Sequence, residues 1–325
     1  MRFALSEEQQ ELASTVRTLL ARRSDPAAVR AAMTSDQGYD AALWQTLCEQ
    51  IGVAALLVPE EYDGAGATLV EAHVVLEELG RALTPGPALA SLVATAALLG
   101  ADEDARKRLL PRIATGEIAT VAWGEAVLHG DQAEILLVAA DDRLYEVDAT
   151  AVTRTWTPAM DLTTRLATVN LDDAAMTQIG DAAAVAHAHA VGTIGVTALQ
   201  VGLAERALEM TVSYTKERVQ FGRPLASFQA LKHRMAQMLV DVETSRSISW
   251  AAAYAVATGA PDADDLTAAA SSYCSEALQR IGAETVQLHG GIAITWEHDA
   301  QLVFKRAHAL GQLFGQPHER RATLL

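Results

Sequence analysis

The chain has 325 residues, of which 50% are hydrophobic and only 5% aromatic, and 41 acidic against 25 basic residues give a formal net charge of -16. This length accommodates two or three domains with buried cores, and the alanine-rich composition favours packed helices over sheets. The acidic balance argues against a nucleic-acid partner, because phosphate binding needs a basic surface that the sequence lacks. A few local arginines would still suffice for a small anionic ligand.

The two cysteines, Cys48 and Cys274, lie far apart in the sequence and show neither metal-binding nor redox spacing. Such cysteines are typical of proteins in a reduced, cytosolic environment. No run approaches the roughly 20 apolar residues of a membrane span, and the segment Met1–Gln9 lacks a signal-peptide pattern. We therefore expect a cytoplasmic protein with no metal site and no membrane partner.

Helical patterns fill the first part of the chain. Ser6 and Gln9 have the spacing of a capping box, which marks the start of a helix. Apolar residues at helical spacing continue through 41–51, 68–83, 88–99 and 105–114, with turn signals between them. The pattern predicts an N-terminal helical domain over residues 1–117.

The pattern changes near Gly116 to short strands. Residues 119–123, 134–138, 143–147 and 165–169 have strand character, and Gly or Asp residues separate them. They predict a small β-sheet domain of four or five strands over residues 118–180.

From Asp181 onward the helical period returns. Residues 183–215 form an almost unbroken run of roughly 50 Å, and Pro224 separates this run from a second helix because proline lacks the amide donor. A third helix ends at Gly290, and a fourth follows. Four helices joined by short links predict an up-and-down four-helix bundle over residues 181–325. The expected fold class is therefore mainly α with a small β module.

The stretch Arg218–Gln229 carries the first sign of chemistry. Arg218 and Phe221 stand three residues apart, and so on one helix face if the first bundle helix still continues there. A guanidinium beside an aromatic ring suits a flat ligand that carries phosphate. The alternative is a helix end with a solvated arginine and a core phenylalanine.

The stretch Gln287–Ile292 carries the second sign. Its paired glycines, Gly290 and Gly291, are consistent with a helix C-cap. They would equally allow the backbone to approach a pyrophosphate, with Gln287 as an amide donor.

With both stretches present, the chain resembles the acyl-CoA dehydrogenases. The resemblance is carried by Glu217–Leu225 with Phe228–Gln229, by Gln287–Ile292 with Thr295–Glu297, and by Leu5–Gln9 and Val58–Gly64. The order of helices, small sheet and helix bundle matches over the whole chain. The resemblance implies an FAD enzyme that removes two hydrogens from the α and β carbons of an acyl-CoA thioester. It also implies electron-transferring flavoprotein as the electron acceptor.

In that family the flavin lies at a subunit interface. The sheet domain of one subunit holds the isoalloxazine ring, and the bundle of its neighbour holds the adenine diphosphate end. The residues of this chain that match the adenine-end site are Arg218, Phe221, Leu225, Phe228, Gln229, Gln287, Gly290 and Gly291.

The resemblance fails at the catalytic base. The family abstracts the α proton with a glutamate, and the alignment places Phe314 at the preceding tyrosine and Gly315 at the base. Some relatives carry the base on the first bundle helix, at a position that falls near Gly192, and Val191–Gly195 contains no carboxylate. We therefore assign no catalytic residue in this chain.

Four other side chains are candidates for a relocated base. Glu205 lies too far along its helix, and Glu297 matches a position that the family uses structurally. His308 and Glu319 are the nearby groups that could substitute.

The sheet domain departs from the family as well. Relatives hold the flavin ring with a threonine-glutamate-proline loop, a glycine-serine turn and a later tryptophan-threonine pair. Here Trp123–Asp131 contains no such turn, and Trp156–Thr157 is at most a remnant of the pair. A flavin-ring pocket is therefore not expected in this chain.

These departures favour a hetero-oligomer. The chain resembles the short subunit of the α2β2 acyl-CoA dehydrogenases of steroid-degrading actinobacteria. It would supply the ADP end of the FAD site, while a full-length partner supplies the ring site and the catalytic glutamate for a bulky acyl-CoA of the steroid side-chain type. Two alternatives stay open: a self-sufficient homo-oligomer with a relocated base, and a non-catalytic or repurposed family member such as a hydratase.

Overall fold

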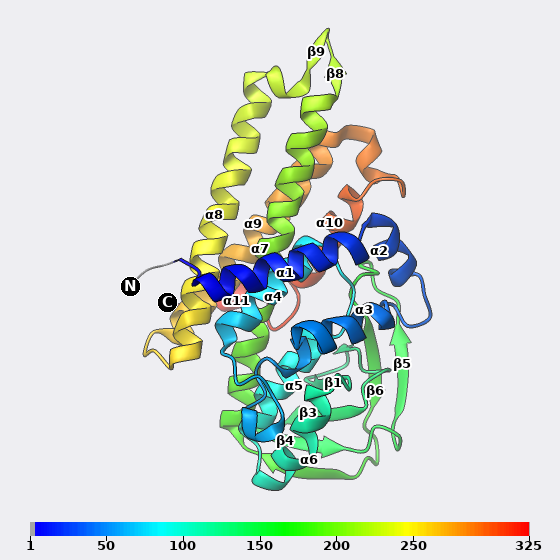
Figure 1. Cartoon of the computed structure of the whole chain (residues 1–325), viewed down its shortest axis with the longest axis vertical. Coiled ribbons are helices and arrows are strands. Elements are labelled where there is room, and N and C mark those ends of the chain that lie inside the picture. Colours follow the sequence, from blue (N-terminus) through cyan, green and yellow to red (C-terminus); the bar gives the residue numbers. More distant parts are fainter. Residues whose placement is uncertain (1–3, 325) are drawn as a thin grey trace.

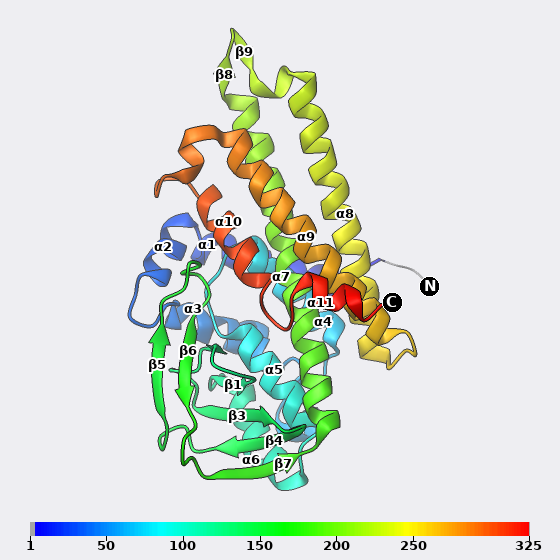
Figure 2. The same ribbon diagram turned by 180° about the vertical axis from the view of Figure 1, so that it is seen from behind.

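The computed structural model describes residues 4–324 and has the predicted fold class, mainly α with a small β module. The molecule is elongated, with a helix bundle that ends in the β8–β9 hairpin and with the sheets at the opposite end (Figures 1 and 2). The division into domains at residues 117/118 and 180/181 stays a prediction.

The N-terminal helices begin where the sequence signals them. Ser6 accepts from the amide of Gln9 at 3.2 Å and donates its own amide to the Gln9 side chain at 3.0 Å, which completes the capping box. The elements are α1 (Glu7–Arg23), α2 (Pro26–Met33), α3 (Ala41–Thr46), η1 (Leu47–Ile51), η2 (Val53–Ala55), η3 (Glu60–Tyr62), α4 (Leu69–Arg81), α5 (Ala88–Leu99) and α6 (Glu103–Ala114).

The β module contains seven strands in two sheets, so the prediction of four or five strands in one sheet is wrong. One sheet has the order β1-β3-β4-β7, with β1 and β3 parallel, and the other has the order β2-β6-β5. The strands are β1 (Ala119–Ala122), β2 (Val127–Leu128), β3 (Ile135–Ala140), β4 (Arg143–Val147), β5 (Thr153–Thr157), β6 (Leu166–Asn170) and β7 (Met176–Gly180). Sequence patterns missed three strands. Strand β2 has only two residues, and most residues of β5 and β7 are exposed and carry no apolar alternation.

The C-terminal elements form the bundle. They are α7 (Ala182–Glu217), β8 (Val219–Gln220), β9 (Arg223–Pro224), η4 (Leu225–Ser227), α8 (Gln229–Thr258), α9 (Ala263–His289), η5 (Gly290–Ile294), α10 (Ala300–Leu310) and α11 (Pro317–Ala322). The fourth bundle helix, α10, has only 11 residues, and α11 follows it.

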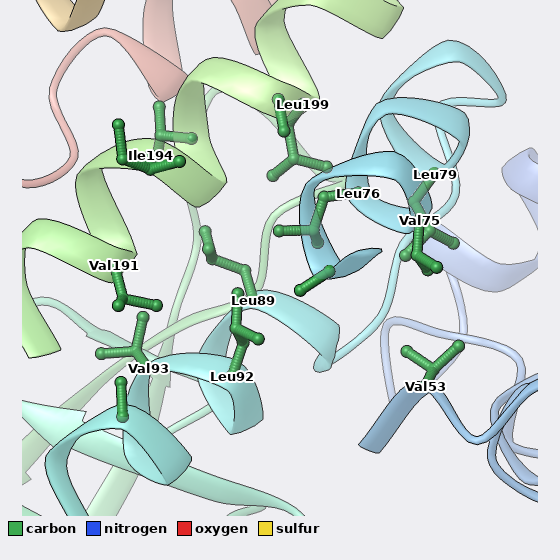
Figure 3. Packing of buried hydrophobic residues seen from close by; sticks show 14 of the residues in the cluster. Val53, Val75, Leu76, Leu79, Leu89, Leu92, Val93, Val191, Ile194 and Leu199 are labelled. Carbon is green, nitrogen blue, oxygen red and sulfur yellow. The ribbon is translucent and has the colours of Figure 1, made fainter. Parts of the chain in front are cut away.

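Helix α7 connects the bundle to the rest of the molecule. An added Cβ at Gly202 would lie 1.8 Å from the carbonyl oxygen of Glu77, and one at Gly80 would lie 2.2 Å from that of Leu199, so α4 and α7 touch backbone to backbone. Around this contact α4, α5 and α7 share one apolar core, with Val75, Leu76, Leu79, Leu89, Leu92, Val93, Val191, Ile194 and Leu199 side by side (Figure 3).

The expectation that no segment approaches a membrane span needs correction at α7. Within residues 4–324 this helix alone has the length and apolar character of a span, with a mean hydropathy of 1.4 over 18 residues. Inside the protein 61% of that window is buried, as expected for the central helix of a packed bundle.

Candidate functional site

The stretch Arg218–Gln229, predicted to contact the cofactor and called here the first cofactor stretch, begins on a hairpin and not on a helix. Helix α7 ends at Glu217, and Arg218 adopts an extended conformation while its amide still donates to the Tyr214 carbonyl at 2.8 Å. The Leu225 amide donates to the Arg218 carbonyl at 2.8 Å and closes the β8–β9 hairpin. The condition under which Arg218 and Phe221 would share a helix face, that the first bundle helix continues to Phe221, is therefore not met.

The hairpin presents an aromatic and cationic surface. Phe221 has a φ of 55° at the turn and is 90% exposed. Its ring packs edge-to-face on half-buried Phe228, with centroids 6.2 Å apart. The Arg223 guanidinium lies 4.0 Å from the Phe228 ring centroid. Sequence reasoning did not single out Arg223, because only the turn brings its side chain over that ring.

The remaining residues of this stretch lead into α8. Leu225 lies half-buried in the short η4 turn, and Gln229 is the exposed first residue of α8. The cap residue Phe228 makes no side-chain hydrogen bond to the helix. The first amide groups of a 30-residue helix therefore face outward, beside the hairpin, where they can donate to an anion.

The stretch Gln287–Ile292, called here the second cofactor stretch, contains the end of α9. Gly290 has a φ of 67°, which confirms a glycine at the helix end, and the positions of an added Cβ on Gly290 and Gly291 face open space. Gln287 is exposed on the last turn of α9. The ends of α7 and α9 lie at the same end of the bundle (Figures 1 and 2). Both stretches thus present exposed surface there rather than an enclosed pocket.

A cavity lies beside Gly315, one of the two expected base positions. It has a volume of about 620 Å³ and lies between α5, β1, α7 and the segment after α10. Its wall is mostly apolar, including Val93, Val121, Met160, Leu313 and Phe314. That this chain has no flavin-ring pocket of its own stays a prediction.

Three polar side chains of the cavity wall, Thr120, Asp161 and Thr164, are already engaged within the chain. Thr120 donates to the Leu128 carbonyl at 2.6 Å, and Thr164 donates to Asp161 at 2.6 Å. The buried Asp161 also accepts from the amide and hydroxyl of Thr163. A flavin ring needs several donors along its polar edge, and these three side chains are not free to supply them.

Both expected base positions are glycines that the packing closes. An added Cβ at Gly192 would lie 2.6 Å from the Phe314 ring, so that ring occupies the space of a side chain there. Gly315 has a φ of 103°, and its added Cβ would lie 2.9 Å from Nε of Arg320. A glutamate at either position would need the neighbouring side chain to move.

Three rings form the wall around these glycines. Trp123, His189 and Phe314 meet edge-to-face, with centroids between 5.6 and 6.1 Å apart. The Arg320 guanidinium lies 3.2 Å from both ring nitrogens of His189 and donates to the Phe314 carbonyl. Burial, with a smaller contribution from the Arg320 charge, lowers the pKa of His189 to about 4. His189 is therefore a neutral wall residue at physiological pH.

The relocated-base candidates differ in position. His308 lines the cavity and packs its ring against Phe304 at 4.6 Å. Glu319 is exposed and accepts from the Gln316 amide at 2.8 Å, so it caps α11. Glu205 pairs with Arg81 and Arg246, and Glu297 is exposed. Among the four, only His308 lies in the wall of the cavity.

The Trp156–Thr157 pair, expected as a remnant of the flavin-ring site, lies on β5. Trp156 is 47% exposed, and the Arg165 guanidinium lies 5.5 Å from its ring centroid. Thr157 shares a hydrogen bond with Thr168 across the sheet. The pair therefore belongs to the outer face of the three-stranded sheet.

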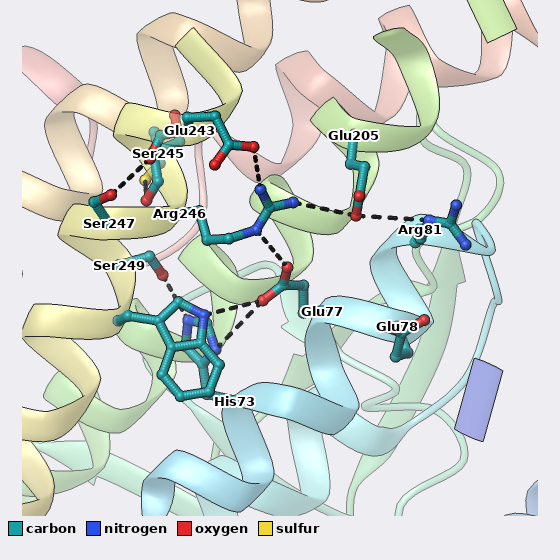
Figure 4. A network of polar contacts seen from close by, with 12 residues as sticks. His73, Glu77, Glu78, Arg81, Glu205, Glu243, Ser245, Arg246, Ser247 and Ser249 are labelled. Carbon is teal, nitrogen blue, oxygen red and sulfur yellow. Dashed lines mark hydrogen bonds and ion pairs between the residues drawn. The ribbon is translucent and has the colours of Figure 1, made fainter. Parts of the chain in front are cut away.

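A buried polar network between α4, α7 and α8 contains the residue types of a hydrolase triad. Nε2 of His73 lies 2.6 Å from the Ser249 hydroxyl, and Nδ1 lies 3.9 Å from Glu77 (Figure 4). His73 and Ser249 are completely buried. No substrate reaches them, and the network joins helices instead. Within residues 4–324 no group of three or more His, Cys, Asp or Glu side chains is arranged for a metal ion.

Comparison with known proteins agrees with this architecture. The family descriptions "Acyl-CoA dehydrogenase, N-terminal domain" and "Acyl-CoA dehydrogenase, C-terminal domain" match residues 6–117 and 175–318. Acyl-CoA dehydrogenase IpdE2 of Mycolicibacterium smegmatis is 46% identical over 322 residues, which are 98% of each chain.

Two solved structures are also similar. The "Tcur3481-Tcur3483 steroid ACAD G363A variant" has a TM-score of 0.91 at 28% identity, over 98% of this chain and 96% of that one. The ChsE4-ChsE5 complex from Mycobacterium tuberculosis has a TM-score of 0.90 at 26% identity, over 100% of this chain and 98% of that one. On the family matches and the 46% identity together, this chain belongs to the acyl-CoA dehydrogenase family.

Proposed function

We propose that this chain is one subunit of an FAD-dependent acyl-CoA dehydrogenase that forms the α,β double bond of a bulky acyl-CoA thioester. In this reaction a base takes the α proton, the β carbon loses a hydride, and the electron pair left at the α carbon forms the double bond. FAD supplies the hydride acceptor. The chain contributes the ADP end of the FAD site, while a partner subunit supplies the flavin-ring site and the glutamate.

One observation carries the proposal: this chain keeps the residue types of the adenine-end site but has glycine at both expected base positions. The expected base positions are Gly192, against Phe314, and Gly315, beside Arg320, so neither carries a carboxylate and a side chain at either would need its neighbour to move. The adenine-end residues, by contrast, are the right types and lie at the end of the bundle, where all but the half-buried Leu225 and Phe228 are exposed. A chain that contacts FAD across a subunit interface but carries no base of its own fits a hetero-oligomer.

The residues that would hold the ADP end fit the group. Arg218 is exposed and has no acidic partner within 4 Å among residues 4–324, so its charge is available for a phosphate. Phe221 and Phe228 offer aromatic surface. Gly290 and Gly291 leave their backbone open to close approach, and Gln287 adds an exposed amide. Leu225 and Gln229 complete the set.

The substrate, acceptor and compartment follow from the family and its relatives. The similar Tcur3481-Tcur3483 protein is described as a steroid ACAD, which supports a steroid side-chain thioester as the bulky substrate. Electron-transferring flavoprotein is the acceptor expected for the family. Both cysteines are free, which agrees with the cytoplasm as the compartment.

The test is to produce the chain alone and together with a full-length partner, and to record the visible spectrum and the turnover of each preparation. The expected result is a chain that holds no stoichiometric flavin alone and a yellow, active complex. A chain that is yellow, fully occupied and active by itself would contradict the proposal.

A chain that is active by itself would favour the self-sufficient enzyme. In that enzyme His308, which lies in the cavity wall, would act as the base. A chain that binds acyl-CoA but gives no turnover with any partner would favour the non-catalytic family member instead.

A further inference from the structure

Three aromatic side chains that no part of the proposed site uses lie between the two cofactor stretches. Tyr214 stacks on His289, with ring centroids 4.4 Å apart and an angle of 27° between the planes. His298 packs on His289 at 4.5 Å and meets Tyr214 edge-to-face at 6.2 Å. We call these three residues the aromatic clamp.

The clamp joins the ends of three segments. Tyr214 belongs to the last turn of α7, and its carbonyl holds the Arg218 amide. His289 is the last residue of α9, directly before Gly290. His298 lies just before α10, and its Nδ1 accepts from the Ala300 amide at 3.1 Å. The clamp is thus the contact between α7 and α9 at the point where both cofactor stretches leave the bundle.

Hydrogen bonds fix the orientation of both imidazoles. Nδ1 of His289 lies 2.7 Å from the Thr285 carbonyl, which can only accept, so Nδ1 carries the proton. Nδ1 of His298 accepts from a backbone amide, so its proton is on Nε2. Nε2 of His289 is buried without a partner among the described residues. The ring of His289 is therefore held for its shape and position rather than for a second hydrogen bond.

The contact between α7 and α9 continues one turn earlier, where the Thr211 and Thr285 hydroxyls lie 3.3 Å apart. Beyond the clamp the chain leaves the bundle, because Arg218 turns into the exposed hairpin and Gly290 adopts a positive φ. The stacked rings are therefore the contact between α7 and α9 that lies next to both Arg218 and the paired glycines.

We infer that the aromatic clamp fixes the spacing of the two cofactor stretches, so that Tyr214 and His289 are positioning residues for a nucleoside diphosphate bound between them. This inference rests on the proposed function, which assigns the ADP end of FAD to these stretches. It assigns new roles to Tyr214, His289 and His298, which do not touch the ligand in this scheme.

The test measures FAD affinity in the complex of this chain with its partner, after removal of the flavin and titration with FAD. Tyr214→Leu and His289→Ala remove one member of the stack each and should weaken binding about three- to tenfold. Tyr214→Phe keeps the ring and should bind within about twofold of the unsubstituted complex. Tyr39→Leu is the control, because it removes a comparable ring contact, with His129 at 6.0 Å, far from the bundle end.

A second measurement tests, without flavin, whether the aromatic clamp connects the two cofactor stretches. Hydrogen exchange of the hairpin amides at 218–225 should become faster in His289→Ala, although residue 289 belongs to the other stretch, while exchange in α5 stays unchanged. This measurement also decides the matter if Tyr214→Leu does not fold.

The outcomes separate the two ideas. If the unsubstituted complex takes up no FAD, the proposed function fails, and the exchange experiment alone judges the clamp. If FAD binds and Arg218→Ala weakens it while Tyr214→Leu and His289→Ala do not, the clamp inference is wrong. A loss in Tyr214→Phe as large as in Tyr214→Leu would also overturn it, because the hydroxyl and not the ring would then be responsible.

Discussion

Gly192 lies against the Phe314 ring, and Gly315 adopts its positive φ beside the Arg320 guanidinium. Each glycine stands where the resemblance to the family predicts a catalytic glutamate, and the contact with its neighbour is not visible in the sequence. A side chain at either position would need Phe314 or Arg320 to move.

Because Gly192 lies against the Phe314 ring, a larger side chain at this position should destabilise the protein measurably. Gly192→Ala should lower the free energy of unfolding by about 1–3 kcal/mol, because its methyl group overlaps the Phe314 ring. The double variant Gly192→Ala/Phe314→Leu should recover most of the loss. Urea unfolding checks both. Gly282→Ala is the control, since its added Cβ would meet the nearest atom at an ordinary 3.5 Å, and an equal loss there would point to helix effects instead.

Arg218 carries the charge of the proposed diphosphate site. Arg218→Ala in the complex should weaken FAD retention by about 1.5–3 kcal/mol, the range for a hydrogen bond to a charged group, which is roughly 10- to 150-fold in Kd. Fluorescence titration with FAD measures it. Arg23→Ala, an exposed arginine at the end of α1, should have no effect. Unchanged flavin content in Arg218→Ala would show that the role carried over from the family is wrong.

His308 tests whether the base lies in this chain. If the glutamate belongs to the partner, His308→Gln should leave turnover of the complex within an order of magnitude, because the substitution alters only the cavity wall. Glu319→Gln, at the cap of α11, should do the same. A collapse of turnover in His308→Gln with intact flavin would place the base in this chain.

At the level of elements, α4 is fixed to the bundle by polar as well as apolar contacts. The His73 ring is buried against α8, where it reaches Ser249 and lies beside Trp250 at 4.9 Å. Arg246 of α8 joins Glu77 of α4 and Glu205 of α7 in one ionic network (Figure 4). These contacts join α4 to both α7 and α8 and so hold the N-terminal helices against the bundle.

The buried histidine predicts a loss of stability in acid. Burial lowers the pKa of His73 to about 3, so the unfolded chain, with a pKa near 6.5, binds the proton first as the pH falls. The His73 contribution is complete above about pH 6.5 and is lost progressively toward pH 3, with about 2 kcal/mol gone at pH 5. Urea unfolding at pH 7 and pH 5 measures this difference.

The matched variant is His73→Gln, which can keep a hydrogen bond to Ser249 but does not titrate. Its free energy of unfolding should vary less between pH 7 and pH 5 than that of the unsubstituted chain. Equal slopes in the two proteins would show that other groups cause the acid effect.

At the level of the whole molecule, the β module meets the bundle through two buried charged residues that the Thr163 hydroxyl connects. Asp161, between β5 and β6, accepts from the Thr163 hydroxyl at 2.6 Å, and Arg306 of α10 donates to the same hydroxyl at 2.8 Å. Burial lowers the pKa of Arg306, while Asp161 acts in the opposite direction. Thr163 thus bridges two charges across the interface beside the cavity.

Removal of one member of this pair should be costly. Asp161→Ala leaves the Arg306 guanidinium buried without its countercharge and should destabilise the protein by about 3–5 kcal/mol. Arg306→Met in the same chain should recover part of this loss. Tryptophan fluorescence during urea unfolding measures both. Asp148→Ala is the control, because Asp148 makes the same bonds to Thr150 at an exposed site and should be nearly neutral.

Local sequence signals determined most of the fold. The capping box at Ser6, the stop before Ala88, the long helix from residue 182 and the glycine end of α9 all depend on neighbours within a few residues, and the structure confirms them. The two exposed strands β5 and β7 escaped prediction, because strands without a buried face lack the alternation on which the prediction depends.

The candidate site divides in the same way. Sequence alone identified the family, the stretches that match its adenine-end site and the absence of a glutamate at the base positions. Only the tertiary structure placed Arg218 on a hairpin, Arg223 over Phe228, and Phe314 in the space beside Gly192. The physical reason is that spacing along a chain fixes local conformation, whereas contacts between distant residues depend on how the helices pack.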